Sequence, residues 1–296
     1  MQAAIDIGSN TVRLLIGEAA AGRVQVHSQA LLTTRLGNTR VGEKLSVEGR
    51  QKTIAALQQF AEQLRQAGGV SRPPVVAATS AVREASDGAD FQQEVRQKLG
   101  WQLQILSGAE EAACSFAGAA SVLPQGANTA QVAVLDVGGG STELICRRPN
   151  GQVAGRSVRV GAVRLFNDEV RPEELPQRLA ELLPPDGLAG LGPVNRFISV
   201  GGTITLVAAL LENLSEYRRE AVSGRPVTRQ EIAGLRELLA PLSPAARLQR
   251  YPMLLGREDI IIAGLTIYLA LADLLGAAEF VASDAGLLDG LLLAGY

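Results

Sequence analysis

A glycine-rich stretch between two apolar runs is the first place in this sequence whose residue types suggest chemistry. Residues 132–135 are all apolar, as in a fully buried strand, and Asp136 follows them directly. The turn that comes next contains Gly138, Gly139, Gly140 and Ser141, and Glu143 introduces the second apolar run. Glycines let a chain turn tightly and present backbone N–H groups to an anion, and Asp136 could hold a divalent cation. The stretch fits a phosphate site and, taken alone, fits an ordinary glycine-rich hairpin turn equally well.

A second copy of this pattern near the N-terminus favours the phosphate interpretation. Residues 4–16 again place an Asp-x-Gly turn between two apolar runs, and its polar and glycine positions are Asp6, Gly8, Ser9 and Asn10. Two matched strand–turn–strand units in one chain predict a duplicated domain with a ligand between its halves.

A third glycine turn follows the strand-like residues 197–200. Gly201, Gly202 and Thr203 open a helical stretch, and a helix N-terminus of this kind can bind an anion or a nucleotide phosphate. An ordinary strand-to-helix turn is the alternative interpretation of the same residues.

Charged residues at two element ends add candidates for catalysis. Arg83 follows the apolar strand 75–78 at the end where ligands bind in α/β sheets, although a solvated helix arginine would have the same sequence. Glu110 and Glu111 open another predicted helix, where acids often only complement the helix dipole. Successive helical residues lie about 100° apart, so only one of these two carboxylates can point into a cleft.

Composition restricts the class of protein. The 296 residues are 47% apolar and 20% charged with a net charge of −2, which predicts about two globular domains and no global field that would attract nucleic acid. The low aromatic content of 4% also argues against a stacking surface for single strands. With His27 as the single histidine, and Cys114 and Cys146 far apart, a histidine-based zinc site is excluded and a reducing compartment is expected.

No membrane association is expected from the sequence. Met1 is followed almost at once by the first predicted strand, without a cationic leader, and the longest uncharged apolar run, 260–272, is shorter than a membrane helix. The expected location is therefore the cytoplasm.

Strands alternate with helices along the chain, which predicts an α/β fold of two related domains. Each half begins with a predicted β-meander, and the best linker is 123–128. We place the domains at 1–124 and 125–296, with the last helix, about 284–296, packing back on the first domain. Long helices are expected at 229–240 and 257–275.

Taken together, the motifs resemble those of the Ppx/GppA family of exopolyphosphatases and guanosine pentaphosphate phosphohydrolases. The matching segments, in family order, are 6–16, 79–85, 107–112, 135–144, 199–203, 257–260 and 283–284. This family belongs to the superfamily of actin, sugar kinases and heat-shock chaperone ATPases. The resemblance implies two actin-like (ribonuclease H-like) domains, an active-site cleft between them, and a homodimer.

The resemblance also implies roles for individual residues. Glu111 matches the family's catalytic acid/base and Arg83 the arginine that holds the substrate phosphate. Asp136 and Glu143 match the carboxylates that bind Mg²⁺ or Mn²⁺. The implied phosphate-binding residues are Asp6, Gly8, Ser9, Asn10, Gly138, Gly139, Gly140, Ser141, Gly201, Gly202 and Thr203.

Two departures from the family pattern stand out. Many members carry Gly-Leu-Arg-Glu-Gly near the end, whereas this chain has Leu288 at the arginine position. Longer members also have a C-terminal helical domain that this sequence lacks. The chain therefore resembles a short, two-domain member.

The function implied by the resemblance is hydrolysis of the terminal phosphoanhydride bond of inorganic polyphosphate. Guanosine pentaphosphate (pppGpp), which presents the same terminal phosphate, is the alternative substrate. A sugar or acetate kinase of the same superfamily is a further reading, against which the Ser-Gly-x-Glu-Glu-Ala motif at 107–112 argues. A non-catalytic sensor of nucleotides or alarmones is the remaining one.

Overall fold

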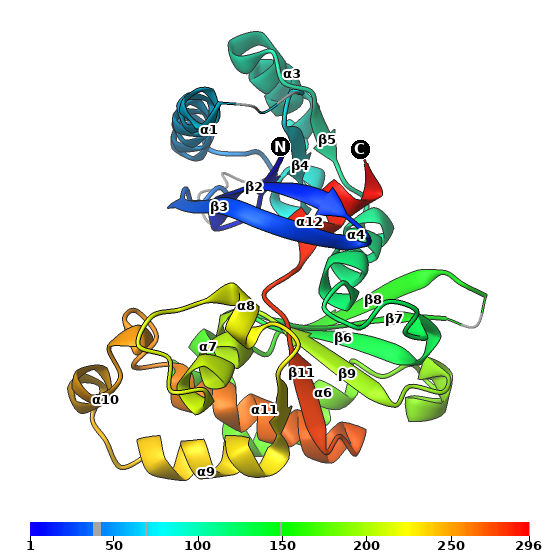
Figure 1. The fold of residues 1–296 in the computed structure, drawn as a ribbon, viewed down its shortest axis with the longest axis vertical. Coiled ribbons are helices and arrows are strands. Elements are labelled where there is room, and N and C mark those ends of the chain that lie inside the picture. Colours follow the sequence, from blue (N-terminus) through cyan, green and yellow to red (C-terminus); the bar gives the residue numbers. More distant parts are fainter. Residues whose placement is uncertain (38–42, 69, 71, 149, 296) are drawn as a thin grey trace. The chain divides into compact units, whose positions relative to one another are not determined.

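Two β-sheets organise the chain, one in each of two units. The computed structural model describes residues 1–37, 43–68, 70, 72–148 and 150–295. Unit 1 comprises Met1–Ser121 and Gly286–Tyr296, and unit 2 comprises Val122–Ala285 (Figure 1). Both units mix strands and helices, so the predicted α/β class is confirmed.

Unit 1 contains a five-stranded sheet in the order β3-β2-β1-β4-β5. Its strands are β1 (Gln2–Ile7), β2 (Thr11–Ala20), β3 (Arg23–Thr33), β4 (Val75–Ala78) and β5 (Leu103–Ile105). Its helices are α1 (Val47–Ala67), α2 (Ser80–Arg83), α3 (Gly88–Leu99), α4 (Gly108–Ala120) and α12 (Leu287–Ala294). The first three strands form an antiparallel meander, and β4 and β5 add to β1 in parallel.

Unit 2 contains a six-stranded sheet in the order β10-β11-β9-β6-β7-β8. Its strands are β6 (Val132–Val137), β7 (Thr142–Arg147), β8 (Val153–Val158), β9 (Arg196–Val200), β10 (Pro226–Thr228) and β11 (Glu279–Ala282). Its α-helices are α5 (Ala162–Phe166), α6 (Leu175–Ala180), α7 (Gly202–Leu211), α8 (Arg219–Val222), α9 (Arg229–Leu239), α10 (Pro244–Arg250) and α11 (Ile261–Leu275). Short 3₁₀ turns occur at Thr129–Gln131, Pro172–Glu174, Gly187–Leu191 and Pro252–Leu254.

The two sheets share one topology. Strands β8-β7-β6-β9-β11 repeat the order and the directions of β3-β2-β1-β4-β5, with an antiparallel meander followed by two parallel additions. The duplication predicted from the two Asp-x-Gly turns is therefore present in the fold. The apolar run 132–135 forms the buried centre of its sheet, as its pattern predicts.

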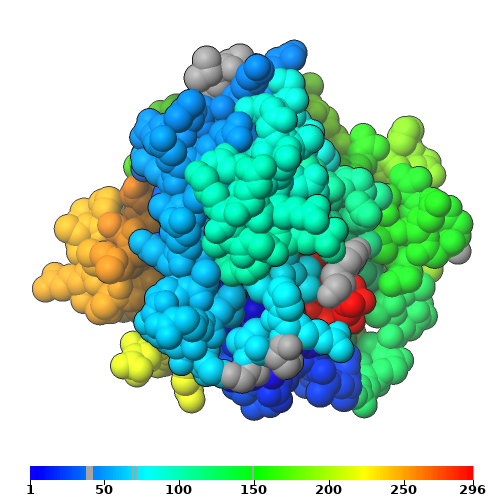
Figure 2. Space-filling view, turned by 90° about the horizontal axis from the view of Figure 1, so that it is seen from above, coloured from blue at the N-terminus to red at the C-terminus, as the bar shows by residue number. Residues whose placement is uncertain are grey.

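The two faces of the unit 1 sheet are covered by different helices. Alternate residues of β1 (Ala3, Ile5 and Ile7) pack with α1 and α3, which form much of the surface seen in Figure 2. Ala4 points to the other face, which α4 and α12 cover. Asp6 shares this second face with Ala4, because side chains two residues apart in a strand point the same way.

Helices α4 and α12 pack in backbone contact. A Cβ atom added at Gly290 of α12 would overlap the carbonyl oxygen of Cys114 in α4, and one at Gly118 of α4 would overlap the carbonyl oxygen of Gly286. The two glycines therefore permit a close crossing that positions α4 against the sheet.

The boundaries of α11 differ from the expectation at 257–275. The helix begins at Ile261, because residues 255–260 form turns, and Asp259 Oδ1 accepts a hydrogen bond from Ile260 N (2.8 Å) just before the helix. None of the described helices has both the length and the apolar content needed to cross a membrane.

Candidate active site

The turn between β6 and β7, loop 138–141, directs its amides toward one side. Gly138 N donates to Ser141 O (2.9 Å), and three carbonyl oxygens of the loop accept hydrogen bonds from α5. These bonds run from Ala162 N to Gly138 O (3.0 Å), from Val163 N to Gly139 O (2.9 Å) and from Arg164 Nε to Gly140 O (2.8 Å). In a trans peptide the N–H points opposite to the preceding C=O. The amides of residues 139–141 therefore point away from α5, where an anion can reach them.

The turn between β1 and β2, loop 8–11, is built in the same way. Gly8 N donates to Thr11 O (3.0 Å), matching the single bond that closes loop 138–141. Ser9 O accepts from Gly37 N (2.7 Å), and Asn10 O accepts from Thr34 N (3.0 Å) and Arg35 N (2.9 Å). The amides of Asn10 and Thr11 consequently point away from residues 34–37. Ser9 Oγ lies 3.1 Å from Ser80 Oγ at the start of α2, which ties the loop to the helix that carries Arg83.

Equivalent cross-strand pairs beside the two loops carry different charges. Asp6 is opposite Arg13, and Asp136 is opposite Glu143. Arg13 donates to Asp6 Oδ2 from Nε (3.0 Å) and Nη2 (2.6 Å), and the Asp6 side chain is only 4% exposed. Unit 1 thus has an arginine beside loop 8–11, whereas unit 2 has two carboxylates at the equivalent position beside loop 138–141. The sequence motifs do not indicate a role for Arg13, although its position opposite Asp6 in the hairpin follows from the turn length.

The Asp136–Glu143 pair suits a hard cation. Ser157, the cross-strand neighbour of Glu143 on β8, donates a hydrogen bond to Glu143 Oε1 (2.7 Å). Within the described residues, no group of three His, Cys, Asp or Glu side chains could enclose a metal ion. Mg²⁺ usually takes one or two protein carboxylates and completes its shell with water and phosphate oxygens. The donors present here fit that requirement and would not fit zinc.

The glycine turn before α7 lies between a carboxylate and a guanidinium. Gly201 has φ of +94°, and a Cβ there would lie 2.8 Å from Asp136 Oδ1. A Cβ at Gly202 would overlap the guanidinium of Arg257. The Thr203 side chain is buried against Gly264 of α11. The group that Thr203 offers to an anion at the start of α7 is therefore its backbone N–H. Arg257 belongs to a family-like motif, but only the structure places its charge at this turn.

Arg83 and Glu111 form an ion pair in unit 1. Arg83 Nη1 donates to Glu111 Oε2 (2.7 Å) and to Leu106 O (2.8 Å), and both side chains are 31% exposed. Among the described residues, Nε and Nη2 of Arg83 have no hydrogen-bond partner. The Nε–Nη2 edge is the side of a guanidinium that can bind a phosphate through two parallel hydrogen bonds.

Leu288 is a core residue in this chain. It lies on α12 in an apolar cluster with Ala4, Cys114 and Leu291, and only 8% of it is exposed. The position where the family pattern has arginine therefore contributes packing here.

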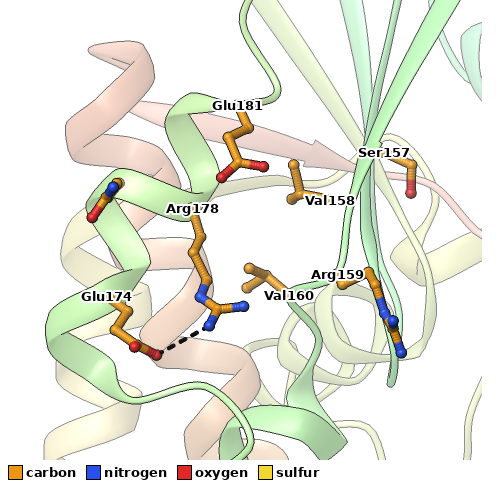
Figure 3. Close-up of a pocket in the computed structure, with 8 residues that line it drawn as sticks. Ser157, Val158, Arg159, Val160, Glu174, Arg178 and Glu181 are labelled. Atoms are coloured by element: carbon orange, nitrogen blue, oxygen red, sulfur yellow. Dashed lines mark ion pairs between the residues drawn. The ribbon is translucent and has the colours of Figure 1, made fainter.

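A separate groove of about 520 Å³ in unit 2 contains none of the predicted site residues. It lies between residues 157–160 and the α6 region, where Glu174, Arg178 and Glu181 face Val158 and Val160 (Figure 3). Its lining includes two arginines, Arg159 and Arg178, and two glutamates, and Arg178 is paired with Glu174 (3.5 Å), so the groove has no excess positive charge for a polyanion.

A duplicated α/β fold with amide-lined turns, an arginine–glutamate pair and a pair of carboxylates defines an enzyme class that handles phosphoryl groups. The model of the Ppx/GppA phosphatase family matches residues 15–295. The chain belongs to this family and is a phosphoanhydride hydrolase.

Individual relatives agree with this assignment over nearly the whole chain. Exopolyphosphatase 2 of Mycobacterium tuberculosis (strain ATCC 25618 / H37Rv) is 31% identical over 317 residues, covering 98% of this chain and 97% of the relative. The type II crystal structure of the Aquifex aeolicus Ppx/GppA phosphatase has a TM-score of 0.82 at 25% identity and covers 99% of this chain and 98% of that one. An exopolyphosphatase from Cytophaga hutchinsonii shares the fold, with a TM-score of 0.76 at 21% identity, covering 99% and 97% of the two chains.

Proposed function

We propose that this protein is an exopolyphosphatase that releases orthophosphate from the end of inorganic polyphosphate. The observation that supports the proposal is the geometry of Arg83, whose Nη1 binds Glu111 while its Nε–Nη2 edge has no hydrogen-bond partner among the described residues. The name of the Mycobacterium tuberculosis relative supports the same substrate class.

Glu111 is the general base in this proposal. Its carboxylate accepts a proton from a water molecule whose oxygen attacks the terminal phosphorus in line. The bond from that phosphorus to the bridging oxygen breaks, and the electron pair leaves with the shortened chain. The guanidinium of Arg83 orients Glu111 and binds the terminal phosphate at the same time, so the base and the reacting phosphorus are held close to each other.

The backbone amides that point away from α5 and from residues 34–37 bind phosphate oxygens in this proposal. Asp136 and Glu143 hold Mg²⁺ or Mn²⁺, which when bound offsets the negative charge of non-bridging oxygens. Arg13, fixed by Asp6, supplies a permanent positive charge beside loop 8–11.

Ser157→Ala should weaken Mg²⁺ binding about 10-fold, because Glu143 loses the hydrogen bond that fixes one of its oxygens. Calorimetric titration of the protein with Mg²⁺ measures this affinity. Ser28→Ala on β3, where the serine is exposed, is the matched control. Equal affinities for both variants would show that Ser157 does not position Glu143.

Guanosine pentaphosphate is a second candidate substrate because of an exposed ring near loop 138–141. Val163 of α5 packs over Gly139, and Phe166, one turn further along the same helix, is 49% exposed. A nucleoside could contact such a ring, whereas inorganic polyphosphate has no apolar part.

Phosphate release tests both substrates directly. Purified protein with Mg²⁺ is incubated with long polyphosphate, short polyphosphate and guanosine pentaphosphate, and each reaction is repeated with Phe166→Ala. The proposal expects polyphosphate to have the highest kcat/KM and to be unaffected by Phe166→Ala. A preference for guanosine pentaphosphate that Phe166→Ala reduces would favour the second candidate, and no release from any substrate would refute both.

A further inference from the structure

The two neighbouring glutamates at the start of α4 make different contacts. Glu110 Oε2 accepts hydrogen bonds from the backbone N–H of Ser107 (2.8 Å) and from Ser107 Oγ (2.7 Å), while Ser107 Oγ accepts one from Glu110 N (3.2 Å). This reciprocal arrangement is a capping box, with Ser107 as the N-cap residue. The contacts hold the pKa of the Glu110 carboxyl below its ordinary value, so Glu110 remains an ionised acceptor. Glu111 takes no part in the box and pairs with Arg83 instead.

Ser107, which belongs to the box, and its neighbour Leu106 anchor the Arg83–Glu111 pair. Ser107 O accepts the backbone hydrogen bond of Glu111 N (2.9 Å), and Leu106 O, one residue earlier, accepts from Arg83 Nη1 (2.8 Å). The carbonyl oxygens of residues 106–107 therefore hold Glu111 by its main-chain N–H and Arg83 by its guanidinium. Without the box, the first turn of α4 would fray, since its N–H groups have no other partner within the helix.

We infer that Ser107 and Glu110 are positioning residues that hold Glu111 and Arg83 in their reactive geometry. This inference rests on the proposed function of Glu111 as the base. It also explains the adjacent acids at 110 and 111, because one carboxylate caps the helix and leaves the other available for proton transfer.

The chain offers a matched control for the stability that any helix cap contributes. Thr228 and Glu231 form a second capping box at the start of α9, with Thr228 N donating to Glu231 Oε2 (2.8 Å) and Glu231 N donating to Thr228 Oγ1 (3.1 Å). No predicted site residue lies on α9. Thr228→Ala therefore removes a cap hydroxyl without touching the Arg83–Glu111 pair.

The test compares Ser107→Ala with Thr228→Ala in the full-length protein. Both variants should lower Tm by a similar small amount. Ser107→Ala alone should lower kcat for phosphate release about 10-fold with KM changed less than about threefold, because the base is misplaced while the backbone amides of loops 8–11 and 138–141 still bind phosphate. Ser107→Thr, which keeps a capping hydroxyl, should restore most of the rate. Equal kcat values for Ser107→Ala and Thr228→Ala would overturn the inference.

A second pair of variants separates the roles of the two glutamates. Glu110→Gln keeps an acceptor oxygen toward Ser107 and should recover most of the rate that Glu110→Ala loses. If Glu110→Gln were as inactive as Glu111→Gln, Glu110 would itself be the base and the inference would be wrong.

Hydrogen exchange gives a readout that does not depend on turnover. Ser107→Ala should speed exchange of the Glu111 amide at least about 10-fold, while Thr228→Ala leaves it unchanged, because only the first turn of α4 frays. Unchanged exchange of this amide in Ser107→Ala would overturn the inference even in an active enzyme. Lack of phosphate release by the wild type, in contrast, would refute the proposed function, and faster exchange would still show that the box holds the pair.

Discussion

Glu111→Gln is expected to lower kcat for phosphate release by about 10²- to 10⁴-fold, the range typical of a lost general base. Glutamine has nearly the same shape, and its amide oxygen can still accept the hydrogen bond from Arg83 Nη1, which in the native protein is 2.7 Å from Glu111 Oε2. The substitution therefore removes the proton acceptor while keeping the geometry of the pair. Initial rates at saturating polyphosphate with Mg²⁺ measure the effect.

Glu212→Gln provides the control for this prediction. Glu212 also pairs with an arginine, Arg225 (2.8 Å), but this pair lies in unit 2, whereas Glu111 lies in unit 1. Its variant should keep kcat within about twofold, because exposed ion pairs contribute little to stability. A Glu111→Gln enzyme that retained more than a tenth of the wild-type kcat would place the general base elsewhere.

Much of the fold follows from local sequence pattern. The apolar run 132–135 is a buried central strand because every position in it must be apolar when both faces of the sheet are covered. Strand β10 could not be predicted in the same way. Pro226–Thr228 has one buried residue, Val227, and is a strand only because it pairs with β11 some 50 residues further on. Pairings of this kind are set by tertiary contacts that a local pattern does not contain.

The candidate site likewise has some features that the local sequence predicts and others that depend on tertiary packing. The glycine loops are visible in the sequence because glycine is required where backbone groups approach closely. The charge of Arg257 at Gly202 was not predictable, since it depends on how α11 and the turn before it pack against α7. The Ser107–Glu110 box could have been found, because a serine followed three residues later by a glutamate at a helix start is a known capping pattern.

Gly290→Ala is expected to lower the free energy of unfolding by about 3 kcal/mol, the upper part of the usual range for overpacking. The added methyl group would meet the carbonyl oxygen, carbonyl carbon and Cα of Cys114, all of them backbone atoms that no rotamer change can move. Relief requires α4 and α12 to separate, which would expose the apolar cluster around Leu288 and Leu291. Urea denaturation and thermal unfolding followed by circular dichroism measure the loss.

The same substitution at Gly234 should act in the opposite direction. Gly234 lies inside α9 with nothing within 4 Å of an added Cβ, so alanine should raise the free energy of unfolding by up to about 1 kcal/mol through helix propensity. The opposite signs separate the close crossing of α4 and α12 from the general effect of alanine in a helix. Because α4 also carries Glu111, separating α4 from α12 should displace the base. A second-site substitution that restored the stability of Gly290→Ala by separating the helices should therefore still leave kcat reduced. Equal stabilities for Gly290→Ala and Gly234→Ala would show that α4 and α12 have room for a methyl group between them.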